Sequence, residues 1–158
     1  MKPNFNESYR GIRCRVYLVR ENPSDEVICI NNSTDAYDLV RDELVNSDRE
    51  RFLSVMLNVK NHLIGVETVS IGSTTAAIIT PALVFRSALL AGSAVSLILA
   101  HNHPSDDLEP SSNDVEITKV LIEAGKLLGI KVLDHLIVSN RGYRSIREYH
   151  PEIQFSYE

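Results

Sequence analysis

The chain offers little that could cross-link it. Only two of its 158 residues are cysteines, Cys14 and Cys29. Both lie in apolar, strand-like stretches and form no C-x-x-C pair, so buried reduced thiols are expected in place of a redox or zinc pair. A chain of this length can bury a core without disulfides. These features together predict a cytoplasmic protein.

Long apolar runs are also scarce. The longest, at residues 88–100, is interrupted by Gly92, Ser93 and Ser96, so it is too short and too mixed to span a bilayer. Residues 1–10 are polar and lack the apolar segment of a signal peptide. We therefore expect no membrane partner and no signal peptide.

Positive charge is in deficit, because the formal net charge is −5 at pH 7. A protein that neutralises many phosphates normally has a basic surface, so this balance argues against bulk nucleic-acid binding. Two local clusters are nevertheless basic, and solvated surface is the expected role of both. The first comprises Lys2, Arg10, Arg13, Arg15 and Arg20, and the second comprises Arg141, Arg144 and Arg147.

The pattern of apolar and turn residues predicts an α/β protein. The predicted strands are residues 13–19, 26–30, 52–59, 62–71, 76–79, 95–100 and 131–138, with a short one after the turn at 140–142. Two helices are expected in the second half of the chain, at residues 81–91 and 112–128, each followed by a glycine that ends it. Strands interleaved with helices indicate a mixed sheet flanked by helices.

Residues 1–48 are predicted to be a lead-in of strands and one helix, packed on a main domain of residues 49–158. Ser33 or Thr34 is expected to cap that helix. Its apolar face is formed by Ala36, Tyr37, Val40 and Leu44. An exposed strand edge at residues 13–19 would allow a homodimer.

The most informative segment is AHNHP at residues 100–104, directly after the most apolar predicted strand. Histidines at i and i+2 on an extended chain point to the same side, so His101 and His103 can converge on one ion. Asp114, on the first turn of the next predicted helix, can fold back beside them. Two nitrogens and one oxygen form a three-ligand set for Zn²⁺ that leaves one position for water, as in catalytic zinc sites.

Hydrolysis at such a site also needs a group that accepts and returns a proton. Glu67 is the candidate, because a carboxylate within a strand is unfavourable without a partner or a role; an exposed strand position is the alternative. Ser111 could donate a hydrogen bond to an oxyanion. The S-x-x-D sequence from Ser111 to Asp114 also fits an ordinary capping box, which would engage the same carboxylate.

The complete set of glutamate, H-x-H, serine and aspartate matches the JAMM motif. The stretch of about residues 52–145 resembles the RadC family of bacterial MPN/JAB domains, and its matching pieces are NHLI at 61–64, residues 81–89, LAHNHPS at 99–105, LGI at 128–130 and DH at 134–135. The resemblance implies a cytidine-deaminase-like three-layer fold and amide-bond hydrolysis of a peptide or protein substrate. The roles it implies are zinc binding by His101, His103 and Asp114, acid–base catalysis by Glu67 and oxyanion stabilisation by Ser111.

The sequence departs from that family in two places. RadC-like proteins usually carry glycine where this chain has Asp106, and Leu108-Glu109 stands in place of a Pro-Thr-like pair. Full-length relatives also have an amino-terminal helix-hairpin-helix region, which residues 1–48 do not resemble. A DNA-associated accessory protein, with the MPN domain as a binding platform, is the alternative function, and a scaffold without activity is a third.

Other catalytic patterns are missing. A zinc deaminase would have H-x-E and P-C-x-x-C, and a serine hydrolase would have G-x-S-x-G. The complete deaminase pair is missing because the chain has no P-C-x-x-C, and G-x-S-x-G is also missing. No phosphate-binding or dinucleotide-binding glycine pattern occurs. The pair Asp134-His135 is open to two interpretations: a structural turn, or a functional position that either supports the metal ligands or faces the substrate.

Overall fold

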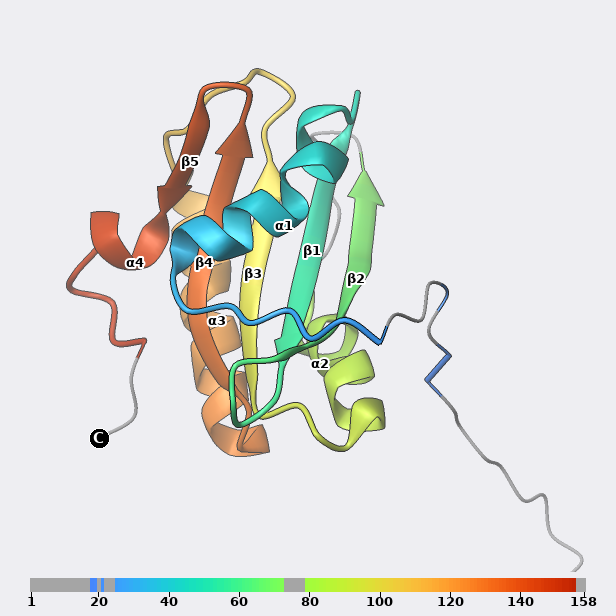
Figure 1. The fold of residues 1–158 in the computed structure, drawn as a ribbon. Helices are drawn as coiled ribbons and strands as arrows, with labels where there is room; N and C mark the ends of the chain where they lie inside the picture. The colour runs from blue at the N-terminus through green and yellow to red at the C-terminus, as the bar shows by residue number, and fades with distance from the viewer. Residues whose placement is uncertain (1–17, 20, 22–24, 73–78, 156–158) are drawn as a thin grey trace, which may run out of the picture.

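The computed structural model describes residues 18–19, 21, 25–72 and 79–155. The protein has three layers, with a central sheet between α1 on one face and α2 and α3 on the other (Figure 1). The helices are α1 (Ser33–Val45), α2 (Pro81–Ala91), α3 (Ser112–Leu128) and the short α4 (Ile146–Tyr149). This is the predicted α/β architecture. The strands predicted at residues 13–19 and 76–79 fall mostly outside the described residues, and those of their residues that are described form no strand.

The sheet has five strands in the order β2-β1-β3-β4-β5. They are β1 (Glu50–Leu57), β2 (Leu63–Gly72), β3 (Ser96–Asn102), β4 (Lys131–Ser139) and β5 (Gly142–Ser145). β3 and β4 are parallel, whereas the other neighbouring pairs are antiparallel. The sheet is therefore mixed, as predicted. The crossover between the parallel strands is α3, which is the helix that carries Asp114.

One face of the sheet packs against α2 and α3. Alternate residues of the central strands point to this side and form an apolar cluster with both helices, whose members include Phe52, Met56, Leu97, Leu99, Val84, Phe85, Leu121 and Ile122. Because side chains alternate along a strand, His101 lies on the same face as Leu97 and Leu99. β3 extends through Asn102, so His101 sits within the strand and is fully buried.

The other face is covered by α1, whose buried Ala36, Val40 and Leu44 pack on β1, β3 and β4. The prediction that Ser33 or Thr34 caps this helix is wrong. Asn32 is the cap, and its side chain accepts a hydrogen bond from the backbone N–H of Asp35 at 2.9 Å. The hydroxyl of Ser33 instead donates to Asp134 of β4 at 2.8 Å, which anchors the helix to the sheet.

The expected strand at residues 26–30 is also absent from the structure. In place of a strand, this segment forms an isolated bridge between Cys29 and His62, and Ile28 and Ile30 make backbone hydrogen bonds to Leu63 and Asn61. Cys29 is exposed, contrary to the prediction of a buried thiol. Cys14, the second cysteine, lies outside the described residues.

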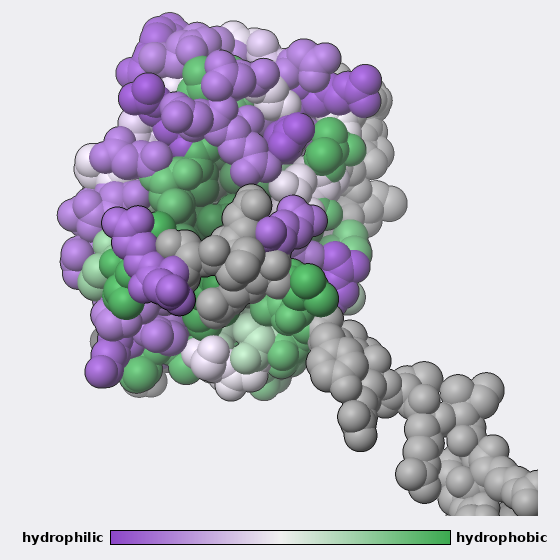
Figure 2. All heavy atoms as spheres, turned by 45° about the vertical axis from the view of Figure 1, so that its right-hand side comes forward, coloured by the Kyte–Doolittle hydropathy of each residue, from purple (hydrophilic) through white to green (hydrophobic). Residues whose placement is uncertain are grey.

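Hydrophilic residues gather over the upper part of the face shown in Figure 2, and hydrophobic residues are exposed lower down. The topology places several exposed apolar side chains at the end of the sheet opposite His101, namely Leu89, Leu90, Val95, Leu127 and Leu128. None of the helices in the described part of the chain has the length and apolar character that a membrane crossing requires.

Candidate metal centre

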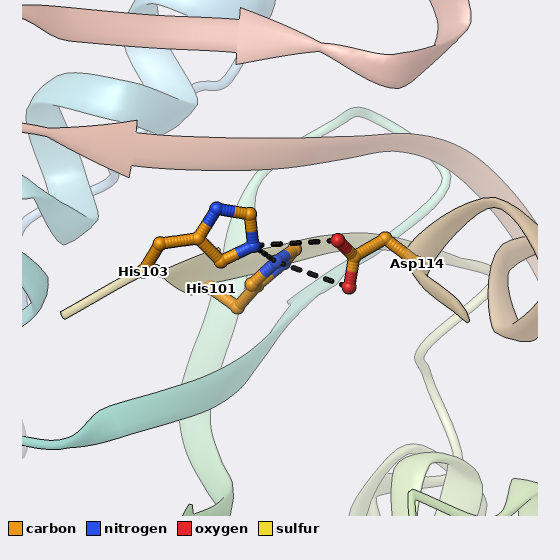
Figure 3. Close-up of side chains that lie close together, drawn as sticks. All are labelled: His101, His103 and Asp114. Carbon is orange, nitrogen blue, oxygen red and sulfur yellow. Dashed lines mark hydrogen bonds and ion pairs between the residues drawn. The ribbon is translucent and has the colours of Figure 1, made fainter. Parts of the chain in front are cut away.

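His101, His103 and Asp114 meet where β3 ends and α3 begins (Figure 3). Nε2 of His101 lies 3.3 Å from Oδ1 of Asp114, and Nε2 of His103 lies 3.3 Å from Oδ2 of the same carboxylate. The two Nε2 atoms are 3.0 Å apart. The three side chains that the sequence pattern singled out are therefore together.

The aspartate is held in this position by the start of its own helix. Ser111 is the N-cap of α3, and its hydroxyl accepts from the backbone N–H of Asp114 at 3.1 Å. In return, Oδ2 of Asp114 accepts from the backbone N–H and the hydroxyl of Ser111, at 2.8 and 2.6 Å. The capping box and the approach to the histidines therefore coexist, since the cap fixes the carboxylate while Oδ1 remains directed at His101.

The spacing of these atoms fits a divalent metal. Two ligand atoms bound tetrahedrally, each about 2.0–2.1 Å from Zn²⁺, are separated by about 3.3 Å. The observed separations are 3.0 and 3.3 Å, and one ligand atom from each of the three residues can be chosen within 4.8 Å of the others. Imidazole nitrogens and a carboxylate oxygen are donors that zinc accepts. Among the described residues, this is the group of histidine, cysteine and acidic side chains that could hold a metal ion.

A hydrogen bond at Nδ1 of His103 determines which of its ring nitrogens can bind a metal. Its Nδ1 lies 2.9 Å from the carbonyl oxygen of Asp107. A carbonyl can only accept, so Nδ1 carries a proton, and Nε2 is the nitrogen available to a metal. A ligand histidine that donates its other N–H to an oxygen is the usual arrangement in metal sites.

Charge in the cluster also favours a cation. The hydrogen bond to Asp114 raises the pKa of His103 above its ordinary value, despite partial burial. Burial alone would raise the pKa of the Asp114 carboxyl, but its interactions with the rings of His101 and His103 and with the hydroxyl of Ser111 hold that pKa well below its usual range. The carboxylate is thus ionised at neutral pH and faces two ring nitrogens across a gap that a proton or a metal ion can bridge.

Behind His101 lies a residue whose role the sequence left open. His135 of β4 is fully buried, and its Nε2 is 2.8 Å from Nδ1 of His101. Its Nδ1 is 2.6 Å from the hydroxyl of Thr118 on α3. The interpretation of Asp134-His135 as a structural turn is therefore wrong for His135, which belongs to the surroundings of the site. Asp134 points to the other face, where it accepts from Ser33 and Ser145.

Glu67 lies on the same face of the sheet as His101. Ser54 of β1 is paired with Glu67 on one side and with Leu99 on the other, which places Glu67 two strands and about 10 Å from Leu99 at the usual strand spacing. Its side chain is 16% exposed, and Oε1 forms an ion pair with Arg86 of α2 at 2.6 Å. Oε2 is buried and has no hydrogen-bond partner in the described part of the chain. The structure thus places Glu67 on the same face of the sheet as His101, but outside the group of His101, His103 and Asp114 that could hold a metal ion.

The structure explains how Asp106 is accommodated at a position where RadC-like proteins usually carry glycine. The backbone of Asp106 is left-handed, with φ of 59°, a conformation that glycine adopts without steric cost. Its Oδ1 accepts from the backbone N–H of Asn140 at 2.9 Å, and Arg141 donates to its carbonyl oxygen. This aspartate therefore ties the loop after His103 to the turn between β4 and β5.

Residues 30–151 match the family described as the RadC-like JAB domain. The chain belongs to the RadC family of JAB domains. The match includes α1 and the three candidate ligands His101, His103 and Asp114. The three-layer fold is thus that of a JAB/MPN-type domain.

Curated relatives carry names that do not mention an activity. The UPF0758 protein of Caldanaerobacter subterraneus subsp. tengcongensis is 47% identical over 123 residues, which cover 78% of this chain and 52% of that protein. UPF0758 proteins of Moorella thermoacetica and Methanosarcina mazei are 44% and 43% identical over 119 residues, with 75% of this chain and 52% of each relative covered. The chain spans about half the length of the curated relatives that it matches.

Proposed function

We propose that this RadC-family domain is a zinc-dependent hydrolase that cleaves an amide bond in a peptide or protein. The observation that carries the proposal is the convergence of His101, His103 and Asp114, with atom separations of 3.0–3.3 Å. Such a three-ligand set leaves one coordination position for a substrate or water, whereas structural zinc sites use four protein ligands.

His101, His103 and Asp114 would hold the metal. A zinc ion in such a site polarises a carbonyl and lowers the pKa of bound water to about 7. The remaining steps belong to the side chains nearby. Glu67 accepts a proton from the attacking water while the oxygen of that water bonds to the carbonyl carbon. Glu67 then returns the proton to the amide nitrogen as the C–N bond breaks.

The position of Glu67 supports this role. It shares the face of the sheet with His101, and its Oε2 is buried without a hydrogen-bond partner in the described part of the chain. An unpaired buried carboxylate oxygen is costly, so one that persists calls for a functional explanation. The ion pair with Arg86 holds the other oxygen and so orients the carboxylate.

Ser111 would steady the oxyanion that forms at the carbonyl. Its hydroxyl currently donates to Asp114 at 2.6 Å. To serve the oxyanion, this proton must turn away from the carboxylate. The backbone N–H of Ser111 also donates to Oδ2, so Asp114 keeps a hydrogen bond during that rotation.

Zinc-dependent hydrolysis tests the proposal directly. The purified chain should cleave members of a panel of internally quenched peptides or an isopeptide-linked lysine probe. Treatment with a chelator should abolish cleavage, and added zinc should restore it. Cleavage that survives chelation, or that Asp114→Ala leaves unchanged, would contradict the proposal, as would the failure of the zinc-loaded chain to cleave any probe.

The structure adds no support for the DNA-binding alternative. The sequence feature that would favour it is the basic cluster at the amino-terminal end, and the residues of this cluster, including Arg13, Arg15 and Arg20, lie outside the described residues. In the second basic cluster, Arg141 lies 3.8 Å from a carboxylate oxygen of Asp106, and Arg144 pairs with Glu109 at 3.0 Å. These side chains have local partners, which reduces their availability to phosphates.

A further inference from the structure

The hydrogen bonds behind His101 form a continuous chain from β3 to α3. They run from Nδ1 of His101 to Nε2 of His135 at 2.8 Å, then from Nδ1 of His135 to the hydroxyl of Thr118 at 2.6 Å. The Thr118 hydroxyl donates to the backbone carbonyl of Asp114, also at 2.6 Å. Both His135 and Thr118 are fully buried, so these bonds do not compete with bulk water.

The direction of each hydrogen bond follows from counting protons. Thr118 has one hydroxyl proton, which it gives to a carbonyl that can only accept. The bond between Thr118 and His135 must therefore use a proton on Nδ1 of His135. A neutral imidazole has only one N–H, and His135 uses that proton in its bond to Thr118. Nε2 of His135 then accepts, and the donor is Nδ1 of His101.

We infer that His135 and Thr118 are positioning residues that keep the proton of His101 on Nδ1 and so leave its Nε2 lone pair directed at the metal position. Zinc-binding histidines usually donate their second N–H to a carboxylate, a backbone carbonyl or a water. In this protein a second imidazole serves as that acceptor. This inference rests on the proposed metal site.

The same chain of hydrogen bonds connects two of the ligand-bearing elements. His101 belongs to β3 and Asp114 to the first turn of α3, while the link between them passes through β4. His135 also packs edge-on against Phe52 of β1, with ring centroids 5.2 Å apart. A change at His135 should therefore alter the orientation of His101 relative to Asp114 as well as its protonated nitrogen.

A pair of substitutions separates the hydrogen bond from packing. In His135→Gln, the amide oxygen can take the place of Nε2 and accept from His101. In His135→Leu no acceptor remains, although both variants lose the ring contact with Phe52. We expect the leucine variant to bind Zn²⁺ about 10- to 100-fold more weakly than the parent, measured by competition with a chromophoric chelator. The glutamine variant should stay much closer to the parent. Thr118→Val should also weaken zinc binding, whereas Thr118→Ser should not.

A spectroscopic measurement on the unaltered chain keeps the inference testable if a variant does not fold. In the chelator-treated parent, two-bond ¹H–¹⁵N spectra should show His101 protonated at Nδ1 and bare at Nε2. An Nε2–H tautomer would overturn the inference, and so would equal zinc affinities for the leucine and glutamine variants. Failure of the parent to bind zinc would contradict the proposed function instead, and the tautomer of His101 would still decide the inference.

Discussion

Arg86 donates a hydrogen bond to Oε1 of Glu67 at 2.6 Å, which leaves Oε2 of the same carboxylate buried without a partner among the described residues. The arginine is 56% exposed, whereas the glutamate side chain is 16% exposed. The pair therefore sits at the boundary of the apolar face, with the carboxylate turned inward. In the proposed mechanism, this inward-facing Oε2 is the oxygen that would accept the proton.

Replacing Glu67 by glutamine should separate metal binding from turnover. The amide keeps the shape of the side chain but cannot accept a proton, so kcat should fall by about 100- to 10,000-fold. Zinc content should match that of the parent, because Glu67 is not a ligand in the proposed site. Steady-state kinetics and elemental analysis of the same preparation check both expectations. Cleavage by this variant at the parental rate would remove Glu67 from the mechanism.

Two substitutions of Ser111 distinguish its cap from its proposed catalytic role. Ser111→Ala should cost about 1 kcal/mol of folding stability through loss of the N-cap, whereas Ser111→Gly should cost only a few tenths. Both remove the hydroxyl, so both should reduce kcat by about 100- to 1,000-fold if it serves the oxyanion. Urea denaturation and kcat are the measurements. A fall in kcat that follows stability, and is therefore smaller in the glycine variant, would indicate a structural role alone.

The raised pKa of His103 predicts how pH affects the chelator-treated protein. Folding stability from this group is fully present below the unfolded pKa of about 6.5 and is lost as pH rises through the higher folded pKa. Zinc needs the unprotonated nitrogen, so zinc affinity should rise over the same range and binding should release a proton. Thermal melts and zinc titrations at several pH values test this. In His103→Ala, the pH-dependent contribution of this imidazole to folding stability should disappear. A pH dependence of stability identical to that of the parent would show that His103 is not its source.

The left-handed backbone at Asp106 predicts an order of stability among its variants. Asp106→Ala keeps the unfavourable φ of 59° and loses the bond to the backbone N–H of Asn140. Asp106→Gly loses the same bond but removes the steric cost, so it should be more stable than the alanine variant by about 1 kcal/mol. Chemical denaturation of both variants provides the comparison. Equal stability would show that the backbone at this position is not strained.

The grouping of the candidate metal ligands could be predicted from the sequence, because the position of each ligand depends on local geometry. An H-x-H pair at the end of an apolar strand fixes two imidazoles on one side, and a serine at the next helix start places an aspartate on its first turn. The cap of α1 could not be predicted, since Asn32, Ser33 and Thr34 all suit that role. Contacts distant in sequence decided it: Ser33 is drawn to Asp134, and Thr34 pairs with the hydroxyl of Tyr143.

The surroundings of the ligands depend on strand register, which sequence patterns do not give. His135 reaches His101 because β4 pairs with β3 so that His135 lies opposite Leu99. A shift of one residue would place His135 on the other face of the sheet. The sequence held one indication, a polar Asp-His pair within an otherwise apolar strand. The ion pair between Glu67 and Arg86 could not be predicted either, because Arg86 lies on a separate helix.

Metal content tests the central claim most directly. The parent chain, loaded with zinc and freed of excess metal by gel filtration, should retain close to one zinc per chain by elemental analysis. His103→Ala, prepared in parallel, should retain almost none, while its circular dichroism spectrum stays that of a folded α/β protein. No retained metal in the parent, or equal metal in a folded His103→Ala, would contradict the account of His101, His103 and Asp114 as a metal site.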